Sequence, residues 1–247
     1  LPPTALQKRM NYIQNNPDFD FWVFQTVRFK NTIAAADRIW NDLSKPNHAD
    51  LHDFLGINPV WHTSGPVWRK NFLAQHSLSF TEGVQSWQDW EFHIRVLLQT
   101  PNYLKIEDVS AAAYQRFHDS ESINKQANKS ITENRLSLFF TLIKAFKTAG
   151  KFDKSIQQSF LKLFYFVFSR QKENIALRAV WLEMEKHFTD IAKIDLLYWK
   201  YYLLFSRANA SIESRVFLFL VKLKPYFEKR IRVTDFSHRT WYRINLK

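Results

Sequence analysis

The chain has 247 residues, of which 46% are hydrophobic and 23% charged, so it can bury a core and is not a disordered chain. It has no cysteine, which excludes disulfides, thiolate metal sites and a cysteine nucleophile. The net charge of +12 is uneven, because residues 1–125 hold 12 Lys and Arg against 13 Asp and Glu, whereas residues 126–247 hold 23 against 10. The resulting charges of −1 and +13 predict two regions with different partners.

Helical and strand-like patterns alternate in the first region. The residues up to Pro17 predict a helix, and the aromatic and β-branched residues of 19–29 predict one strand. Ser86 and Asp89 have capping-box spacing and predict the start of a helix over 89–99. The other expected elements are short helices at 34–43, 50–55 and 69–75, and strands at 103–109 and 111–117.

The second region has a helical pattern only. Its expected helices lie at 127–149, 152–170, 173–187, 189–206 and 210–230. The predicted fold class is therefore α/β with a partial mixed sheet over 1–125, followed by an all-α region over 126–247.

The residues that suggest chemistry lie between Trp61 and His118. They form three groups in order: Thr63 and Ser64 leading to Arg69 and Lys70; Gln88 and Asp89 with Arg95 one turn further on; and Arg116 with His118. In order and spacing these groups resemble the motifs of family 2 glycosyltransferases, which have the GT-A fold. The opening sequence LPPTALQKRMNYIQNNPDFDFWVF also resembles the segment that follows the metal-binding Asp-x-Asp of this family.

The resemblance covers about residues 1–125 and implies the acceptor side of a GT-A domain. It places the nucleotide-binding half before Leu1, so these 247 residues are expected to be inactive by themselves. It implies that Asp89 is the catalytic base, and that Arg116 and His118 bind the donor diphosphate. His118 is also implied as a ligand of a divalent metal, Mg or Mn, whose main ligands lie outside the chain. The implied acceptor-binding residues are Thr63, Ser64, Trp87, Gln88 and Trp90.

Each role has a simpler alternative. Asp89 could serve only in a capping box, and Arg116 and His118 could lie on a surface loop beside a salt bridge. Arg95 is expected to pair with Glu91 one helical turn away, which is a structural role. His62 and His93 show no convincing partner in the sequence and are assigned to the core or the surface.

The basic region contains two helices that mix bulky apolar residues with Lys and Arg, at 196–205 and 216–232. This profile is typical of helices that lie on a membrane, so residues 196–232 are expected to bind an anionic membrane surface. The alternatives are a helical bundle with these aromatic stripes in its core, or a protein partner. No apolar run approaches the roughly 20 residues of a spanning helix, and the first residues show no signal peptide.

The sequence therefore favours an inverting glycosyltransferase that uses a nucleotide-sugar donor and an envelope-polysaccharide or lipid-linked acceptor. We expect a cytoplasmic protein held peripherally at the inner face of the plasma membrane. A non-catalytic interaction module is the second hypothesis. A nucleic-acid-binding protein is the third, and it is disfavoured because the longest basic run is Lys229-Arg230-x-Arg232.

Overall fold

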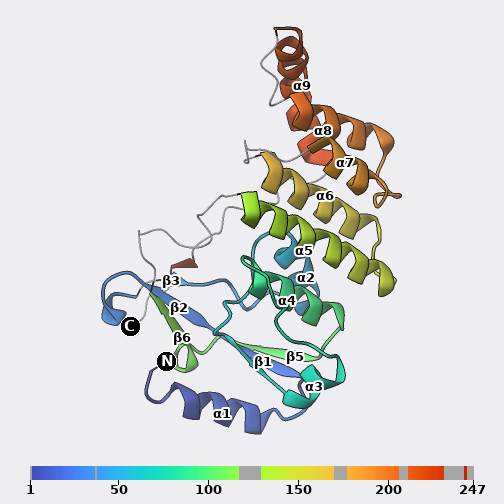
Figure 1. Cartoon of the computed structure of the whole chain (residues 1–247). Coiled ribbons are helices and arrows are strands. Elements are labelled where there is room, and N and C mark those ends of the chain that lie inside the picture. Colours follow the sequence, from blue (N-terminus) through green and yellow to red (C-terminus); the bar gives the residue numbers. More distant parts are fainter. Residues whose placement is uncertain are drawn as a thin grey trace. The chain divides into compact units, whose positions relative to one another are not determined.

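The computed structural model describes residues 2–36, 38–116, 129–169, 177–205, 211–230 and 242–243 (Figure 1). Residue contacts divide the chain into two compact units. Unit 1 contains residues 1–54, 58–126 and 238–247, and unit 2 contains residues 55–57 and 127–237.

Two small mixed sheets form the centre of unit 1. The first has the strand order β4-β1-β5, formed by Pro66–Trp68, Phe21–Phe24 and Tyr103–Ile106. The second has the order β6-β2-β3-β7, formed by Ala113–Arg116, Thr26–Phe29, Arg38–Ile39 and Tyr242–Arg243. In each sheet one pair is parallel, β1 with β5 and β2 with β6, and the other neighbours are antiparallel.

The predicted strand over 19–29 is split at Gln25 into β1 and β2, which belong to different sheets. The Gln25 side chain turns back on the backbone: its Oε1 accepts from the Thr26 amide at 2.9 Å, and its Nε2 donates to the Asn41 carbonyl at 3.1 Å. Because Gln25 is buried, these bonds replace the hydrogen bonds to water that its side chain loses on folding. One polar residue therefore marks where the chain passes from one sheet to the other.

Helices cover both faces of the first sheet (Figure 1). On one face, Tyr12 and Ile13 of α1 (Ala5–Asn15) pack against Trp22 and Phe24. On the other face, Phe21 stacks on Tyr103 with ring centroids 4.6 Å apart. The helices near this second aromatic layer are α2 (Asp50–Leu55), α3 (Lys70–Gln75) and α4 (Gln88–Leu98). Three short 3-10 helices, Ile33–Ala35, Asn47–Ala49 and Val109–Ala111, connect these elements.

Unit 2 is built from helices α5 (Lys129–Thr148), α6 (Lys154–Ser169), α7 (Leu177–Glu185), α8 (Lys193–Phe205) and α9 (Ser211–Arg230). Aromatic rings fill its core, where Phe160 and Trp199 are fully buried. Phe139 meets Phe160 edge to face at 5.1 Å, and Trp199 lies 4.3 Å from Tyr165. These contacts join α5 to α6 and α6 to α8.

The expected class, an α/β region together with a helical region, is confirmed. Two details are wrong. The strand over 19–29 is two strands, and the helix expected over 34–43 is a 3-10 turn followed by β3. Residues 126–247 are also not entirely helical, because Tyr242–Arg243 form β7, which pairs with β3 of unit 1. No helix in the described part of the chain combines the length and apolar character needed to cross a membrane.

Candidate functional site

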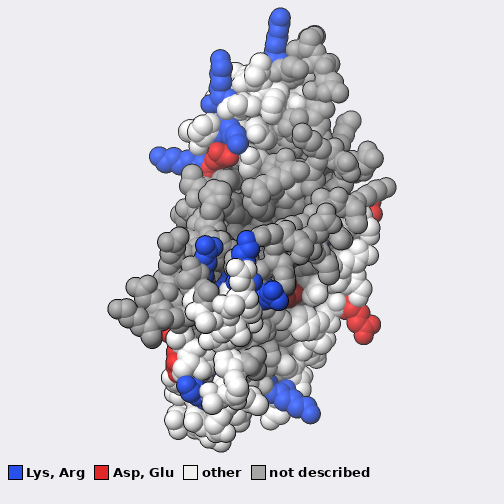
Figure 2. Space-filling model, turned by 90° about the vertical axis from the view of Figure 1, so that its left-hand side faces the viewer, with Lys and Arg blue, Asp and Glu red and all other residues white. Residues whose placement is uncertain are grey.

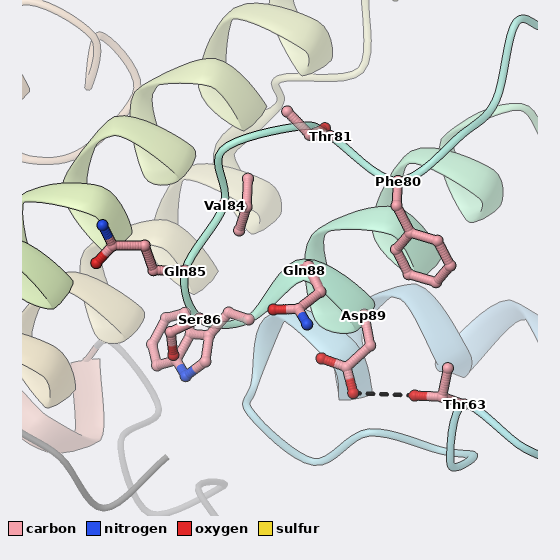
Figure 3. Close-up of a pocket in the computed structure, with 9 residues that line it drawn as sticks. Thr63, Phe80, Thr81, Val84, Gln85, Ser86, Gln88 and Asp89 are labelled. Atoms are coloured by element: carbon pink, nitrogen blue, oxygen red, sulfur yellow. Dashed lines mark hydrogen bonds between the residues drawn. The ribbon is translucent and has the colours of Figure 1, made fainter. Parts of the chain in front are cut away.

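An open pocket of about 500 Å³ lies in unit 1 where α4 begins (Figure 3). Most of its wall comes from the segment that connects α3 to α4, and Thr63, in the loop before β4, lines one side. The lining residues are Thr63, Phe80, Thr81, Val84, Gln85, Ser86, Trp87, Gln88 and Asp89. The volume lies within the usual range of small-molecule sites, and the lining mixes aromatic and polar groups as such sites do.

Asp89 is the carboxylate of this pocket (Figure 3). It lies in the first turn of α4, where the helix dipole favours a negative charge. Its Oδ2 accepts a hydrogen bond from Thr63 Oγ1 at 3.1 Å, and its Oδ1 accepts from the Trp90 amide at 2.9 Å. A carboxylate has about four lone-pair positions, so two remain for a hydroxyl that enters the pocket.

The expected capping box of Ser86 and Asp89 is wrong. Helix α4 begins at Gln88, its N-cap residue is Trp87, and no side chain caps it. Asp89 instead bonds to Thr63, which is 26 positions away in the sequence. Asp89 therefore joins the start of α4 to the loop before β4, and its carboxylate also lines the pocket.

The two tryptophans beside Asp89 have different environments. Trp87 lines the pocket and has φ 69° and ψ 19°, a left-handed conformation that costs a bulky residue about 1–2 kcal/mol. Trp90 is buried, and its Nε1 donates to the Phe54 carbonyl at 2.6 Å. The rings are 5.1 Å apart, so Trp90 supports Trp87 from the core and does not itself line the pocket.

The predicted acceptor residues Gln88 and Ser64 also differ in whether they line the pocket. Gln88 is exposed and lines the pocket beside Asp89. Ser64 is exposed but is not part of the lining, and its Oγ is 2.8 Å from Nδ1 of His62. His62 therefore has polar partners, since its Nε2 also lies 3.3 Å from Gln115 Nε2. These contacts were not predicted from the sequence.

Of the two predicted diphosphate residues, only Arg116 is described, and it does not line this pocket. Arg116 is exposed at the end of β6, and its Nε donates to the Lys30 carbonyl at 3.4 Å. His118, also predicted as a metal ligand, lies outside the described residues. Among the residues that are described, no three His, Cys, Asp or Glu side chains gather as a metal site would require.

An ion pair between a half-buried arginine and a buried carboxylate of α4 holds the rim of the pocket. Arg95 Nε donates to Glu91 Oε1 at 2.5 Å, which confirms the expected pair one turn apart. Thr81 Oγ1 donates to Glu91 Oε2 at 3.1 Å, and Arg95 Nη2 donates to the Ser79 carbonyl at 2.5 Å. The pair thus fixes segment 79–81, whose Phe80 and Thr81 line the pocket. Sequence reasoning missed these lining residues because only the α4 half of the network has recognisable spacing.

His93 lies behind the pocket in the aromatic core. It stacks on Trp68 and meets Trp61 edge to face, with centroids 5.9 and 5.6 Å away. Desolvation by burial lowers the pKa of His93 to about 3, although the charge of Asp89 acts weakly in the opposite direction. His93 is therefore neutral at physiological pH and serves as part of the core.

Comparison with models of protein families, with curated proteins and with solved structures found no match to this chain. The chemistry of the pocket must therefore be argued from its own groups. They are an exposed carboxylate at a helix N-terminus, a neighbouring hydroxyl and amide, and an aromatic ring held in an unfavourable backbone conformation. Such a set can bind a polyhydroxylated molecule and accept a proton from one of its hydroxyls.

Proposed function

We propose that the chain forms the acceptor side of an inverting, GT-A-type glycosyltransferase, with Asp89 as the general base. The observation that carries the proposal is the position of Asp89, at the start of α4 in an open pocket and bonded to Thr63. These two residues belong to separate motifs of the family 2 resemblance, and that resemblance expects both at the acceptor. The substrates would be a nucleotide sugar and a saccharide or lipid-linked acceptor.

The proposed reaction moves one glycosyl group. An acceptor hydroxyl oxygen attacks the anomeric carbon of the donor as the bond from that carbon to the diphosphate oxygen breaks. The hydroxyl proton passes to Asp89, and the leaving nucleoside diphosphate takes the electron pair of the broken bond. General-base help of this kind is typically worth about 10²–10⁴-fold in rate. Attack opposite to the leaving group inverts the configuration of the anomeric carbon.

The pocket residues support acceptor binding in this scheme. The Trp87 ring offers an apolar surface against which a sugar ring can lie, and Gln88 offers an amide for its hydroxyls. Thr63 holds Asp89 in place through Oγ1, which leaves the carboxylate oriented into the pocket. A left-handed tryptophan is kept at a cost to stability, as is common for residues at binding sites.

The donor side is proposed to lie mostly beyond these residues. A divalent metal, Mg or Mn, would neutralise charge on the departing diphosphate. The described residues do not themselves form a metal site, so no step is assigned to such an ion here. Arg116 is exposed and able to contact a phosphate, and the resemblance gives His118 the same role.

The test is a transfer assay on the enzyme that carries both halves of the proposed domain. It would be offered a panel of nucleotide sugars with saccharide and lipid-linked acceptors, and the product anomer would be read by proton NMR. We expect transfer with inverted configuration. Retained configuration, or no transfer and no donor hydrolysis across the panel, would contradict the proposal and favour a non-catalytic interaction module.

A further inference from the structure

Helix α9 of unit 2 exposes large apolar side chains on its outward face. Leu218 and Phe219 are each 61% exposed and Tyr226 is 58% exposed, values that are unusual for three bulky residues on one helix. They alternate with Arg215, Lys222 and Lys229, which follow one another at intervals of seven and therefore lie on the same face. We call these six residues the α9 outward face.

The opposite face of α9 is packed against α8. Phe227 stacks on Tyr198 with centroids 3.9 Å apart, and Tyr198 OH donates to the Leu220 carbonyl at 2.8 Å. Leu220 and Phe227 are buried as a result. The inner face thus already serves the fold, and the exposed residues of the outward face are not needed for it.

Helix α8 differs from α9 in that most of its aromatic residues are buried. Its Tyr198, Trp199 and Tyr202 are buried, so the aromatic stripe over 196–205 belongs largely to the core of unit 2. The bundle alternative is therefore confirmed for most of α8. Its exposed residues Ile194, Leu197 and Tyr201 form a second apolar surface, on the face of α8 away from this core.

The basic residues of α9 fall into two groups. Lys224 pairs with Glu228 at 3.3 Å, and Arg230 pairs with Asp195 at 2.5 Å, so both already have structural partners. Arg215, Lys222 and Lys229 make no ion pair with any described carboxylate and extend from the outward face. Figure 2 shows Lys and Arg side chains projecting among uncharged ones at the top, where α9 lies.

The combination of charge and apolar character selects the partner. Three basic groups without an acidic neighbour on the outward face complement an anionic surface. Leu218 and Phe219, which lie between these basic residues, can enter the acyl boundary of a bilayer, as the apolar residues of amphipathic helices do. Nucleic acid fits this face less well, because bases stack on aromatic rings and gain little from an exposed leucine.

We propose that the α9 outward face, formed by Arg215, Leu218, Phe219, Lys222, Tyr226 and Lys229, lies on an anionic lipid surface. Leu218 and Phe219 enter the headgroup boundary, and the three basic side chains contact lipid phosphates. This inference does not depend on glycosyl transfer. It would hold equally for a non-catalytic module.

The test is co-sedimentation of the 247-residue chain with vesicles. Phosphatidylcholine vesicles would be compared with vesicles that also contain phosphatidylglycerol, at low and high salt. We expect binding to the anionic vesicles only. The binding should weaken in high salt, because the Debye length falls from about 10 Å at 0.1 M to about 3 Å at 1 M.

Matched variants separate the outward face from net charge. Each basic residue near an anionic surface is worth roughly fivefold in affinity, so Arg215→Gln, Lys222→Gln and Lys229→Gln together should reduce binding on the order of a hundredfold. The control changes three exposed lysines away from α9: Lys70→Gln, Lys144→Gln and Lys154→Gln. It removes the same charge and should retain most of the binding.

A third variant tests the apolar part. Leu218→Ser with Phe219→Ser keeps every charge and should lower binding at least about tenfold, with an unchanged circular dichroism spectrum. Equal sedimentation with neutral and anionic vesicles, or binding to neither, would overturn the proposal. An equal loss of binding in the α9 charge variant and in its three-lysine control would overturn it too. Binding to single-stranded RNA without binding to vesicles would overturn it as well.

Discussion

The buried His93 predicts a loss of stability at mildly acidic pH. Burial lowers its pKa to about 3, whereas an unfolded histidine titrates near about 6.5. Below pH 6.5 the unfolded chain therefore binds a proton that the folded chain does not, and the free energy of unfolding falls by about 1.4 kcal/mol per pH unit. Between pH 7 and pH 4.5 this one group should remove about 3 kcal/mol.

The assay is urea unfolding followed by tryptophan fluorescence, because Trp61 and Trp68 surround His93. It would be run at pH 7 and pH 4.5 on the wild type and on His93→Phe, which cannot take up a proton. Carboxylates whose pKa is lowered, such as Asp108, titrate further down the pH scale and are shared by both proteins. The wild type should lose about 3 kcal/mol more than the variant over this interval. Parallel losses in the two proteins would refute the reasoning.

Two further predictions concern unit 1. Lys105→Met should lower the free energy of unfolding by about 3–5 kcal/mol, because it leaves the fully buried Asp50 carboxylate without its cation; adding Asp50→Asn should restore most of the loss in a urea titration. If Lys105→Met is destabilised as expected but the double variant with Asp50→Asn is no more stable, this explanation would be contradicted. At position 87, Trp87→Gly should be more stable than Trp87→Ala by about 1 kcal/mol, because the backbone there is left-handed, and equal melting midpoints would argue against strain at this position.

The secondary structure was largely predictable where the pattern is local. Aromatic and β-branched runs indicated the strands near 21–29 and 103–116, and periodic apolar residues indicated α5 to α9. The break at Gln25 could not be predicted, because it depends on a side chain that bonds to Asn41 after the two segments meet. The short β7 was missed for a similar reason, since a two-residue strand has no pattern of its own.

The candidate site was predictable only in part. Asp89 and Thr63 were both chosen from motif order, and in the structure Thr63 Oγ1 donates a hydrogen bond to Asp89 Oδ2 at 3.1 Å. The start of α4 was misjudged, because Ser86 and Asp89 have capping spacing whereas the left-handed Trp87 is set by tertiary packing. Which basic residues of α9 are unpaired could not be predicted from the sequence either. Lys222 and Lys224 have similar sequence surroundings, but only Lys224 forms an ion pair in the structure.

The most direct test of the proposed function is the turnover number of Asp89→Asn in an enzyme that carries both halves of the proposed domain. Asparagine keeps the size of the side chain but cannot take the acceptor proton, so kcat should fall by at least about a hundredfold, with donor binding and folding unchanged. The matched control is Glu82→Gln, which neutralises an exposed carboxylate in the segment leading to the pocket without changing its lining, and it should leave kcat unaltered. If Asp89→Asn instead turned over within about threefold of the wild type, Asp89 would not be the base and the central claim would be wrong.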